Sequence, residues 1–434
     1  MPDATEPGAG QASAACPAGY RILDVEGLRA MLADVASLRA RLGGPPDSWR
    51  INEVSDGNLN AVFIAEGPAG AVCAKQALPY VRVDQAWAMP LERIVFEHEY
   101  MRRTGPHVGA LAPEIYHYDP TLYCLVMQLL SPHIILRRGL IARRCYPRAA
   151  ADIGEYVARA CFATSALARP FEVAFDALSL FARNQALLRI SVDLIFTDPY
   201  RIAPRNRWTA PYLDGIAAEF RRDAGLKLAA ARWGRRFLTC PQALLHGDLH
   251  SGSVMATEDD TRVIDGEFSF MGPIGFDCGA FIANLLLNAF AQPGHGGEAA
   301  ACRDFQAWVL SQAEVFWARF SERFLALWQQ EAAGDVYPAD LFADPDGARR
   351  LQQERVAFVD GVWTDTVGFA AMKMIRRILG FAHVLDFESI ADPAVRSACE
   401  AGALCFARRM LLEPEAFPTP AALTAAAASA VAAA

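Results

Sequence analysis

The chain has 434 residues, of which 53% are hydrophobic and 21% are charged, and its formal net charge is -8. This composition excludes an intrinsically disordered protein, and the length allows two domains or lobes with buried cores. The negative charge offers no overall attraction to nucleic acid or to an anionic membrane, so any charge that binds phosphate must be local.

The ten cysteines form no Cys-x-x-Cys pair, and most lie within apolar runs, as Cys73, Cys124 and Cys278 do. This pattern is typical of reduced, buried thiols and predicts the cytoplasm. The first residues are Gly/Ala-rich without an apolar stretch, so we expect no secretory signal. The apolar run at 281–290 is too short to cross a bilayer.

Composition and periodicity predict four regions along the chain. We expect a disordered tail at 1–20, an N-terminal lobe at 21–130, a helical C-terminal lobe at 131–412 and an Ala-rich tail at 413–434 that frays. Within the C-terminal lobe, helical periodicity is found in four stretches, 149–167, 171–180, 210–239 and 299–331.

Three strand-like runs open the N-terminal lobe, at 49–54, 61–65 and 71–76, and two more follow at 113–118 and 123–130. The first two runs are joined by a turn that contains Asp56, Gly57, Asn58 and Asn60. Glycine and asparagine at a hairpin tip can bring backbone N–H groups close to phosphates. The same letters also suit a plain hairpin turn.

Lys75 ends the third strand-like run in Val-Cys-Ala-Lys. Such a lysine is usually an edge residue that reaches water. The functional alternative is a pair with nucleotide phosphates and with a carboxylate on the next helix, expected at 90–103. That helix offers Glu97 and Glu99, which face different ways, so only one of them can be the partner.

The stretch His246-Gly-Asp-Leu-His250 is followed by a short apolar strand at 262–264 that leads to Asp265 and Glu267. Phosphoryl transfer requires one carboxylate near the proton of the attacking hydroxyl and further acidic groups that hold Mg²⁺ on the phosphates. Asp248 fits the first role, and the Asp-Gly-Glu pair fits the second. If extended backbone continues through Gly266, both carboxylates of the pair point to one side.

Other interpretations of these residues remain. A lone Asp between two His residues can belong to a capped turn, and Asp-Gly-Glu can be a solvated loop. His246, Asp248 and His250 can also be ligands of zinc or iron in a metallohydrolase. A nucleotide-binding protein without catalysis is a further alternative. The Gly-Asn turn, the strand lysine and the helix glutamate occur in the order found in kinases, which favours a kinase.

The segments His246–Ser253 and Asp265–Gly279 resemble the catalytic core of the S-methyl-5-thioribose kinase family, part of the aminoglycoside and choline kinase-like group. The resemblance extends from about residue 51 to 387. It implies that Asp265 and Glu267 bind the metal in an Asp-x-Glu motif, and that Ser253 replaces a metal-binding Asn of the wider group.

The resemblance also implies roles for the N-terminal lobe and for Asp277. In this family the Asp-Gly-Asn-Leu-Asn loop covers ATP, Glu97 is favoured as the partner of Lys75, and Trp87 belongs to a tryptophan loop near the substrate. Asp277 corresponds to a carboxylate that braces the catalytic loop, although it can also cap the helix that starts there. The hinge between the lobes, where backbone groups meet adenine, is expected at Gln128, Leu129 and Leu130.

Arg376 and Arg377 stand near the end of a predicted helix, with Gly380 just beyond. On their own they suit a helix C-terminus, where cations complement the dipole. The resemblance implies instead a twin-arginine substrate site, in which guanidinium groups donate to sugar hydroxyls and offset charge on the phosphoryl group.

We therefore expect a two-lobed, protein-kinase-like α+β fold. It has an antiparallel N-terminal sheet, a mainly helical C-terminal lobe, and ATP and Mg²⁺ between the two. The reaction that the resemblance implies is phosphorylation of the anomeric hydroxyl of 5-methylthioribose, a step of methionine salvage, by an enzyme that is commonly a homodimer. The alternative is a kinase of another small alcohol: an aminoglycoside, choline or a different 5-substituted pentose.

Overall fold

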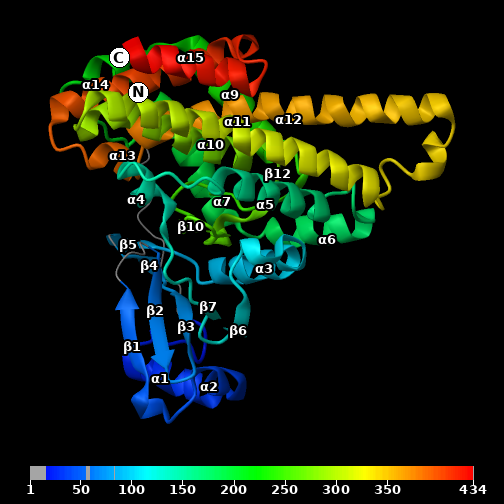
Figure 1. Ribbon diagram of the computed structural model, residues 1–434. Helices are drawn as coiled ribbons and strands as arrows, with labels where there is room; N and C mark the ends of the chain where they lie inside the picture. The colour runs from blue at the N-terminus through cyan, green and yellow to red at the C-terminus, as the bar shows by residue number, and fades with distance from the viewer. Residues whose placement is uncertain (1–15, 55–58, 83, 434) are drawn as a thin grey trace, which may run out of the picture. The chain divides into compact units, whose positions relative to one another are not determined.

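The computed structural model describes residues 16–54, 59–82 and 84–433, and these form two compact units (Figure 1). Unit 1 comprises the chain up to residue 98 together with 115–129, and unit 2 comprises 99–114 together with the chain from 130 onwards. The chain therefore leaves unit 1 for the last time between Leu129 and Leu130, within the segment where we expect a hinge.

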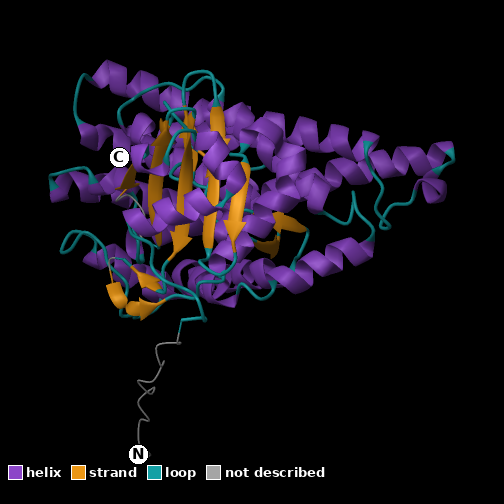
Figure 2. Ribbon diagram, turned by 90° about the horizontal axis from the view of Figure 1, so that it is seen from below, coloured by secondary structure: helices purple, strands orange, loops and turns teal. Residues whose placement is uncertain are grey.

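Unit 1 is built on a five-stranded sheet in the order β1-β2-β3-β7-β6, in which every neighbouring pair is antiparallel. Figure 2 shows these strands side by side. A separate hairpin of β4 (Tyr80–Val81) and β5 (Asp84–Ala88) follows β3. The sheet strands are β1 (Arg50–Val54), β2 (Asn60–Gly67), β3 (Gly70–Ala77), β6 (Ile115–Asp119) and β7 (Cys124–Gln128). All five strands predicted in this region are confirmed, with ends that differ by at most two residues.

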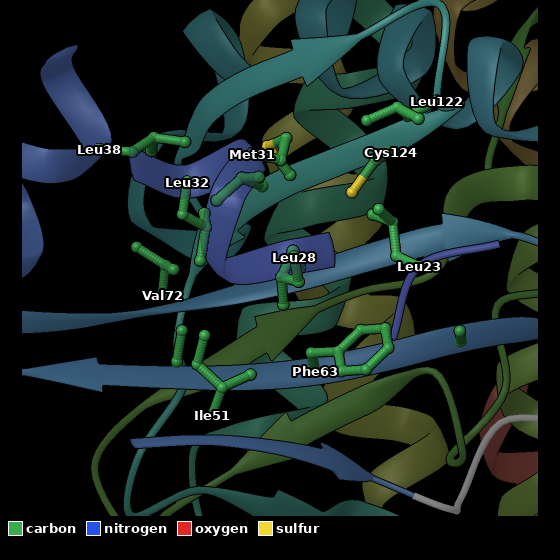
Figure 3. Close-up of a cluster of buried hydrophobic side chains, with 14 of the residues drawn as sticks. Leu23, Leu28, Met31, Leu32, Leu38, Ile51, Phe63, Val72, Leu122 and Cys124 are labelled. Atoms are coloured by element: carbon green, nitrogen blue, oxygen red, sulfur yellow. The ribbon is translucent and has the colours of Figure 1, made fainter. Parts of the chain in front are cut away.

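Two helices, α1 (Val25–Asp34) and α2 (Ala36–Leu42), supply the other side of the core of unit 1 (Figure 3). The Asp24 side chain caps α1 by accepting a hydrogen bond from the N–H of Gly27 at 2.7 Å. The side chains that fill the core are Leu28, Met31, Leu32 and Leu38 from the helices and Ile51, Phe63 and Val72 from the sheet. Helix α3 (Arg93–Val108) begins in unit 1 and ends in unit 2.

Unit 2 is mainly helical, and its centre is α10, of which every residue is buried. This helix carries a single charged residue, Asp277, and a helix that is apolar on all sides must be surrounded by other elements. Helices α11 and α12 run alongside it (Figure 1). The longer helices are α5 (Ala149–Thr164), α6 (Phe171–Phe181), α8 (Asp214–Arg222), α9 (Ala224–Thr239), α10 (Gly275–Ala291), α11 (Ala299–Gln330), α12 (Pro345–Leu379) and α14 (Pro393–Leu412).

Shorter elements of unit 2 hold the turns that carry the acidic motifs. Strands β9 and β12 form one antiparallel pair, and β11, β10 and β8 form a small antiparallel sheet. The shorter elements are α4 (Leu136–Ile141), α7 (Gln185–Ser191), α13 (Leu385–Glu388), β8 (Ile134–Ile135), β9 (Ala243–Leu245), β10 (Val254–Ala256), β11 (Thr261–Val263) and β12 (Phe270–Gly272). Among the helices described here, none is long and apolar enough to cross a membrane.

The two chain ends were expected to form tails without packed structure. The expected N-terminal tail lies outside the described residues up to position 15, but Tyr20 is anchored because its hydroxyl donates to the carbonyl of Ala77 at 2.8 Å. The Ala-rich end does not fray as we expected. It forms α15 (Pro420–Ala433), whose Leu423 and Ala427 are fully buried, and α15 packs on α11. Alanine has the highest helix propensity, and burial of this face supplies the stability that composition alone does not reveal.

Candidate active site

The turn that carries Asp248 follows β9 and requires a glycine. Gly247 has a φ of +83°, and a Cβ atom there would lie 2.1 Å from the carbonyl oxygen of Phe268. The buried Asp277 side chain on α10 accepts hydrogen bonds from the N–H groups of His246, at 2.7 Å, and Gly247, at 3.0 Å. Asp277 thus braces the turn, and the position before the first turn of α10 belongs to Ile274 instead. Burial raises the pKa of Asp277, against the favourable effect of His246.

Asp248 lies among cations from another part of the chain. Its Oδ1 accepts a hydrogen bond from Lys373 Nζ at 3.0 Å, and its Oδ2 lies 3.9 Å from Arg377 Nη2. Both cations belong to α12, more than 120 residues later in the sequence. Burial would raise the pKa of Asp248, but Lys373, and after it His250, hold that pKa well below its usual value. The carboxylate is therefore ionised at neutral pH.

His250 is a neutral neighbour of this carboxylate. Its Nδ1 accepts a hydrogen bond from the N–H of Gly252 at 3.1 Å, so the proton of the neutral ring is on Nε2, which faces Asp248 Oδ2 at 3.3 Å. Burial lowers the pKa of His250 to about 4, although Asp248 acts in the opposite direction. The ring therefore donates a hydrogen bond to the carboxylate without adding a charge.

The twin arginines of α12 lie in the same buried region. Arg376 Nη1 and Arg377 Nη1 both donate to the carbonyl of Ala382, at 3.3 and 3.0 Å. Burial lowers the pKa of each guanidinium. A third guanidinium, Arg137 of α4, lies 3.4 Å from Asp386 Oδ2. The four cations of this cluster, Arg137, Lys373, Arg376 and Arg377, thus exceed its two carboxylates, Asp248 and Asp386, and the region suits an anionic group of a ligand.

Asp265 and Glu267 come together in a way that the sequence does not predict. The backbone does not stay extended through Gly266. Asp265 adopts the left-handed conformation with φ +73°, and residues 266–268 form a short 3₁₀ turn. Carboxylate oxygens of the two residues nevertheless lie within 4.8 Å of one another. Two acidic oxygens at this separation suit a hard divalent cation. The predicted pairing is therefore present, while its expected strand geometry is wrong.

The histidines of this region are engaged in other contacts. His246 Nε2 donates to the carbonyl of Ile264 at 2.8 Å, and His246 Nδ1 accepts from the N–H of Asp248 at 3.3 Å. Both ring nitrogens are thus used to hold the turn against β11. Within the described part of the chain, His246, Asp248 and His250 do not form a cluster with metal-ligand geometry. This arrangement removes the basis for a metallohydrolase.

In unit 1, the strand lysine and the helix glutamate meet. Lys75 Nζ lies 2.9 Å from Glu97 Oε1 and 2.7 Å from Oε2, and both side chains are almost completely buried. Glu99 instead pairs with Arg102 at 2.7 Å and with Arg103 at 3.6 Å. Of the two glutamates that the sequence left open, Glu97 is the partner of Lys75.

The other predicted residues of the nucleotide and substrate sites have varied positions. Asp56, Gly57 and Asn58 lie outside the described residues, whereas Asn60 is buried at the start of β2 and accepts from Arg93 at 3.1 Å. Trp87 is half-buried on strand β5, within the segment between β3 and α3 where we expect the tryptophan loop. Gln128 ends β7, and Leu129 and Leu130 follow it, all three half-buried.

Among the described residues, Lys373 donates to the Asp248 carboxylate at 3.0 Å, a contact that sequence reasoning missed. A signal was available, because the 41 basic residues include only three lysines: Lys75, Lys227 and Lys373. Lys227 is exposed on α9, while the other two are buried against carboxylates. In a chain that uses arginine almost everywhere, a lysine in an apolar helical stretch indicates a position where a compact ammonium is needed.

Comparison with known proteins gives consistent matches. The sequence profile of the phosphotransferase enzyme family matches residues 50–310. A methylthioribose kinase from Escherichia coli O45:K1 is 38% identical over 403 residues, which cover 92% of this chain and 96% of that protein. Methylthioribose kinase 1 of Oryza sativa subsp. japonica is 41% identical and covers 91% of this chain and 92% of its own. A methylthioribose kinase from Yersinia enterocolitica is 39% identical over 83% of this chain and 88% of its own.

Proposed function

The chain belongs to the methylthioribose kinase family, and from that premise we propose that it transfers the γ-phosphoryl group of ATP to the anomeric hydroxyl of 5-methylthioribose. The products are ADP and 5-methylthioribose 1-phosphate, which places the reaction in methionine salvage. The observation that carries this proposal is the ionised carboxylate of Asp248 beside the cations of α12.

In this proposal Asp248 is the catalytic base. Its carboxylate accepts the proton of the anomeric hydroxyl while that oxygen forms a bond to the γ-phosphorus and the bond to the β,γ-bridging oxygen of ATP breaks. The braced turn keeps the carboxylate in one orientation, because Asp277 holds the two N–H groups that precede it. Fixing the reacting groups in this way removes part of the entropic barrier.

Unit 1 supplies Lys75 for the nucleotide phosphates, and its ion pair with Glu97 fixes the direction of the ammonium group. Asp265 and Glu267 would hold the divalent cation, for which we propose Mg²⁺ because both ligands are hard oxygen donors. When bound, the cation neutralises charge on the phosphate oxygens. We further propose that the turn of Asp56, Gly57, Asn58 and Asn60 covers ATP, and that backbone groups at 128–130 contact adenine.

The substrate site that we propose is centred on Arg376 and Arg377. Methylthioribose carries no charge, so hydroxyl recognition depends on hydrogen-bond donors and on an apolar environment for the methylthio group, to which Trp87 is a candidate contributor. The family profile ends at residue 310, before these arginines. Matches that cover more than 90% of a 434-residue chain include positions 376 and 377. The C-terminal region that holds the arginines is thus part of the region aligned with these methylthioribose kinases.

A coupled ADP-release assay with Mg²⁺ and a panel of acceptors tests the proposal. The panel contains 5-methylthioribose, ribose, choline and an aminoglycoside, each at several concentrations. We expect kcat/KM for methylthioribose to exceed the others by at least about 10³-fold, since buried donors left without partners penalise the wrong acceptor. If choline or an aminoglycoside were preferred, the chain would be a kinase of another small alcohol.

The proposal also includes the compartment, the assembly and the identity of the metal. All ten cysteines are unpaired, which supports a reducing compartment and hence the cytoplasm. We propose a homodimer as the assembly, as the resemblance implies, and light scattering coupled to size-exclusion chromatography measures it directly. Titration of activity with Mg²⁺, Mn²⁺ and Ca²⁺ distinguishes the proposed metal from its competitors.

A further inference from the structure

We propose that Lys373 is the positioning residue of Asp248: its ammonium group holds Oδ1, so that Oδ2 is directed to the acceptor hydroxyl. The inference rests on the proposed role of Asp248 as base. A carboxylate can rotate about its last bond, and a base that rotates loses the alignment that proton transfer needs. A cation fixed on one oxygen prevents that rotation.

The contact is built for a fixed geometry. Lys373 Nζ lies 3.0 Å from Asp248 Oδ1, and only 5% of the lysine side chain is exposed. The same ammonium group stands 4.4 Å from the centre of the Phe276 ring on α10, which gives it a cation–π contact on a second side. Asp248 Oδ2 has longer contacts, with His250 Nε2 at 3.3 Å and with Arg377 Nη2 at 3.9 Å, so it keeps a lone pair for an acceptor hydroxyl.

The positions of Lys373 and the two arginines on α12 indicate different roles for the lysine and the arginines. Positions 373, 376 and 377 are spaced by three and four residues, so they lie on one face of α12. Both arginines donate to the carbonyl of Ala382, in the turn that follows the end of α12. Among the described residues of this face, Lys373 is the one within hydrogen-bond distance of Asp248, and the arginines are left for the ligand.

The limited room beside Asp248 explains why position 373 is a lysine and not an arginine. The ammonium group sits between the carboxylate and the face of Phe276, whose ring is completely buried. A planar guanidinium at this position would need more room between the same two groups. Lys373 is one of three lysines among the 41 basic residues of the sequence.

The titratable groups that face Asp248 come from several elements. On α12 they are Lys373, Arg376 and Arg377; Arg137 faces it from α4, and His250 from its own turn. Asp277 on α10 and Asp386 on α13 are the nearby carboxylates. Lys373 contributes most to keeping the carboxylate ionised. Its loss should therefore raise the pH at which activity begins to fall on the acid side, because protonated Asp248 cannot accept a proton.

The test compares Lys373→Met with Lys227→Met. Both replace an ammonium group by a thioether of similar length, but Lys227 is exposed on α9. For Lys373→Met we expect kcat to fall by about 10- to 100-fold with KM for ATP unchanged. The acid limb of the kcat–pH profile should move up by about one unit or more. Lys373→Ala should regain part of its kcat when methylammonium is added. Lys227→Met should match the wild type in every measurement.

A double variant shows whether Lys373 acts through Asp248. If it does, adding Lys373→Met to Asp248→Asn causes no further loss of kcat, whereas independent roles give losses that multiply. Three results would each overturn the inference. They are an acid limb of the kcat–pH profile that does not move in Lys373→Met, no recovery of kcat when methylammonium is added to Lys373→Ala, and losses of kcat that multiply in the double variant. Thermal denaturation checks that the variants fold, and Lys373→Gln replaces Lys373→Met if the latter does not. If the wild type prefers another alcohol, the same measurements are made with that acceptor, so the substrate assignment and this inference fail separately.

Discussion

A base that works among cations has to satisfy two opposed requirements, and Asp248 shows how they are met. The cations of α12 keep its pKa well below the usual value of an aspartate, which ensures the ionised form but weakens the base. A weak base is sufficient here, since phosphoryl transfer passes through a loose transition state in which positioning and electrostatics contribute most. The braced turn and the neutral His250 serve that positioning.

Asp248→Asn gives the first prediction. The amide cannot accept the proton, while the size of the side chain and its contact with Lys373 through an oxygen are retained. We expect kcat to fall by about 10²- to 10⁴-fold with the dissociation constant for ATP unchanged, measured by steady-state kinetics and by nucleotide titration. Turnover close to the wild-type value would rule out Asp248 as the base.

His250 gives a prediction about stability and pH. The pKa of the ring is lowered to about 4 in the folded protein, against about 6.5 in the unfolded chain. Between these two pH values the unfolded state binds more protons than the folded state. The free energy of unfolding therefore falls as pH decreases from 6.5 towards 4, by up to about 1.4 kcal/mol per pH unit. His250→Gln should remove this part of the slope.

Urea denaturation between pH 4.5 and 7.5 measures that slope. Ser253→Ala is the matched control, because the Ser253 hydroxyl lies 3.1 Å from His250 Nδ1 but does not titrate in this range. The control should keep the wild-type slope. Equal slopes for His250→Gln and the wild type would show that the histidine is charged in the folded protein.

At the scale of elements, local sequence patterns predicted the strands and most helices well. They failed where contacts between residues far apart in the sequence determine the structure. The expected helix at 210–239 is two helices, because Asp223 interrupts it and accepts from the N–H of Leu226 to cap α9. The expected frayed end is the packed helix α15, since burial against α11 cannot be inferred from an alanine count. Lys373 reaches Asp248 across 125 residues, a distance over which periodicity carries no information.

The turn after β11 gives a prediction at the same scale. Because Asp265 is held in the left-handed conformation and Glu267 follows in a 3₁₀ turn, both carboxylates contribute oxygens to the same small region. Asp265→Ala and Glu267→Ala should each raise the Mg²⁺ concentration needed for half-maximal activity by about tenfold or more, since each removes a ligand from a hard cation.

Metal titrations at saturating ATP measure this effect. Glu258→Ala, which changes a glutamate in the turn between β10 and β11, is the control and should behave as the wild type. If Asp265→Ala alone had an effect, Glu267 would be a residue of the turn and the Asp-x-Glu interpretation would be wrong.

The described residues form two compact units, each with a core or helix bundle of its own, and each unit contains residues for which we propose a role in ligand binding. Lys75 and Glu97 belong to unit 1, whereas Asp248, Asp265, Glu267 and the arginines belong to unit 2. A ligand that binds only the folded protein stabilises it by mass action, about 2.7 kcal/mol at 100 times its dissociation constant. Thermal stability therefore reports binding of each ligand without requiring turnover.

Methylthioribose at that concentration should raise Tm by about 3 °C for a chain of this length, given the usual entropy of unfolding per residue. Arg376→Ala and Arg377→Ala should reduce the increase with the sugar but retain the increase with ATP and Mg²⁺. The two losses should differ, because neighbouring residues on a helix point about 100° apart and, of the two arginines, Arg377 is the one that forms an ion pair with Asp248, at 3.9 Å. Arg349→Ala, at the exposed start of α12, is the matched control. If both variants kept the full increase with the sugar, the arginines would be a charge cluster at the helix end, and the acceptor would have to be bound elsewhere.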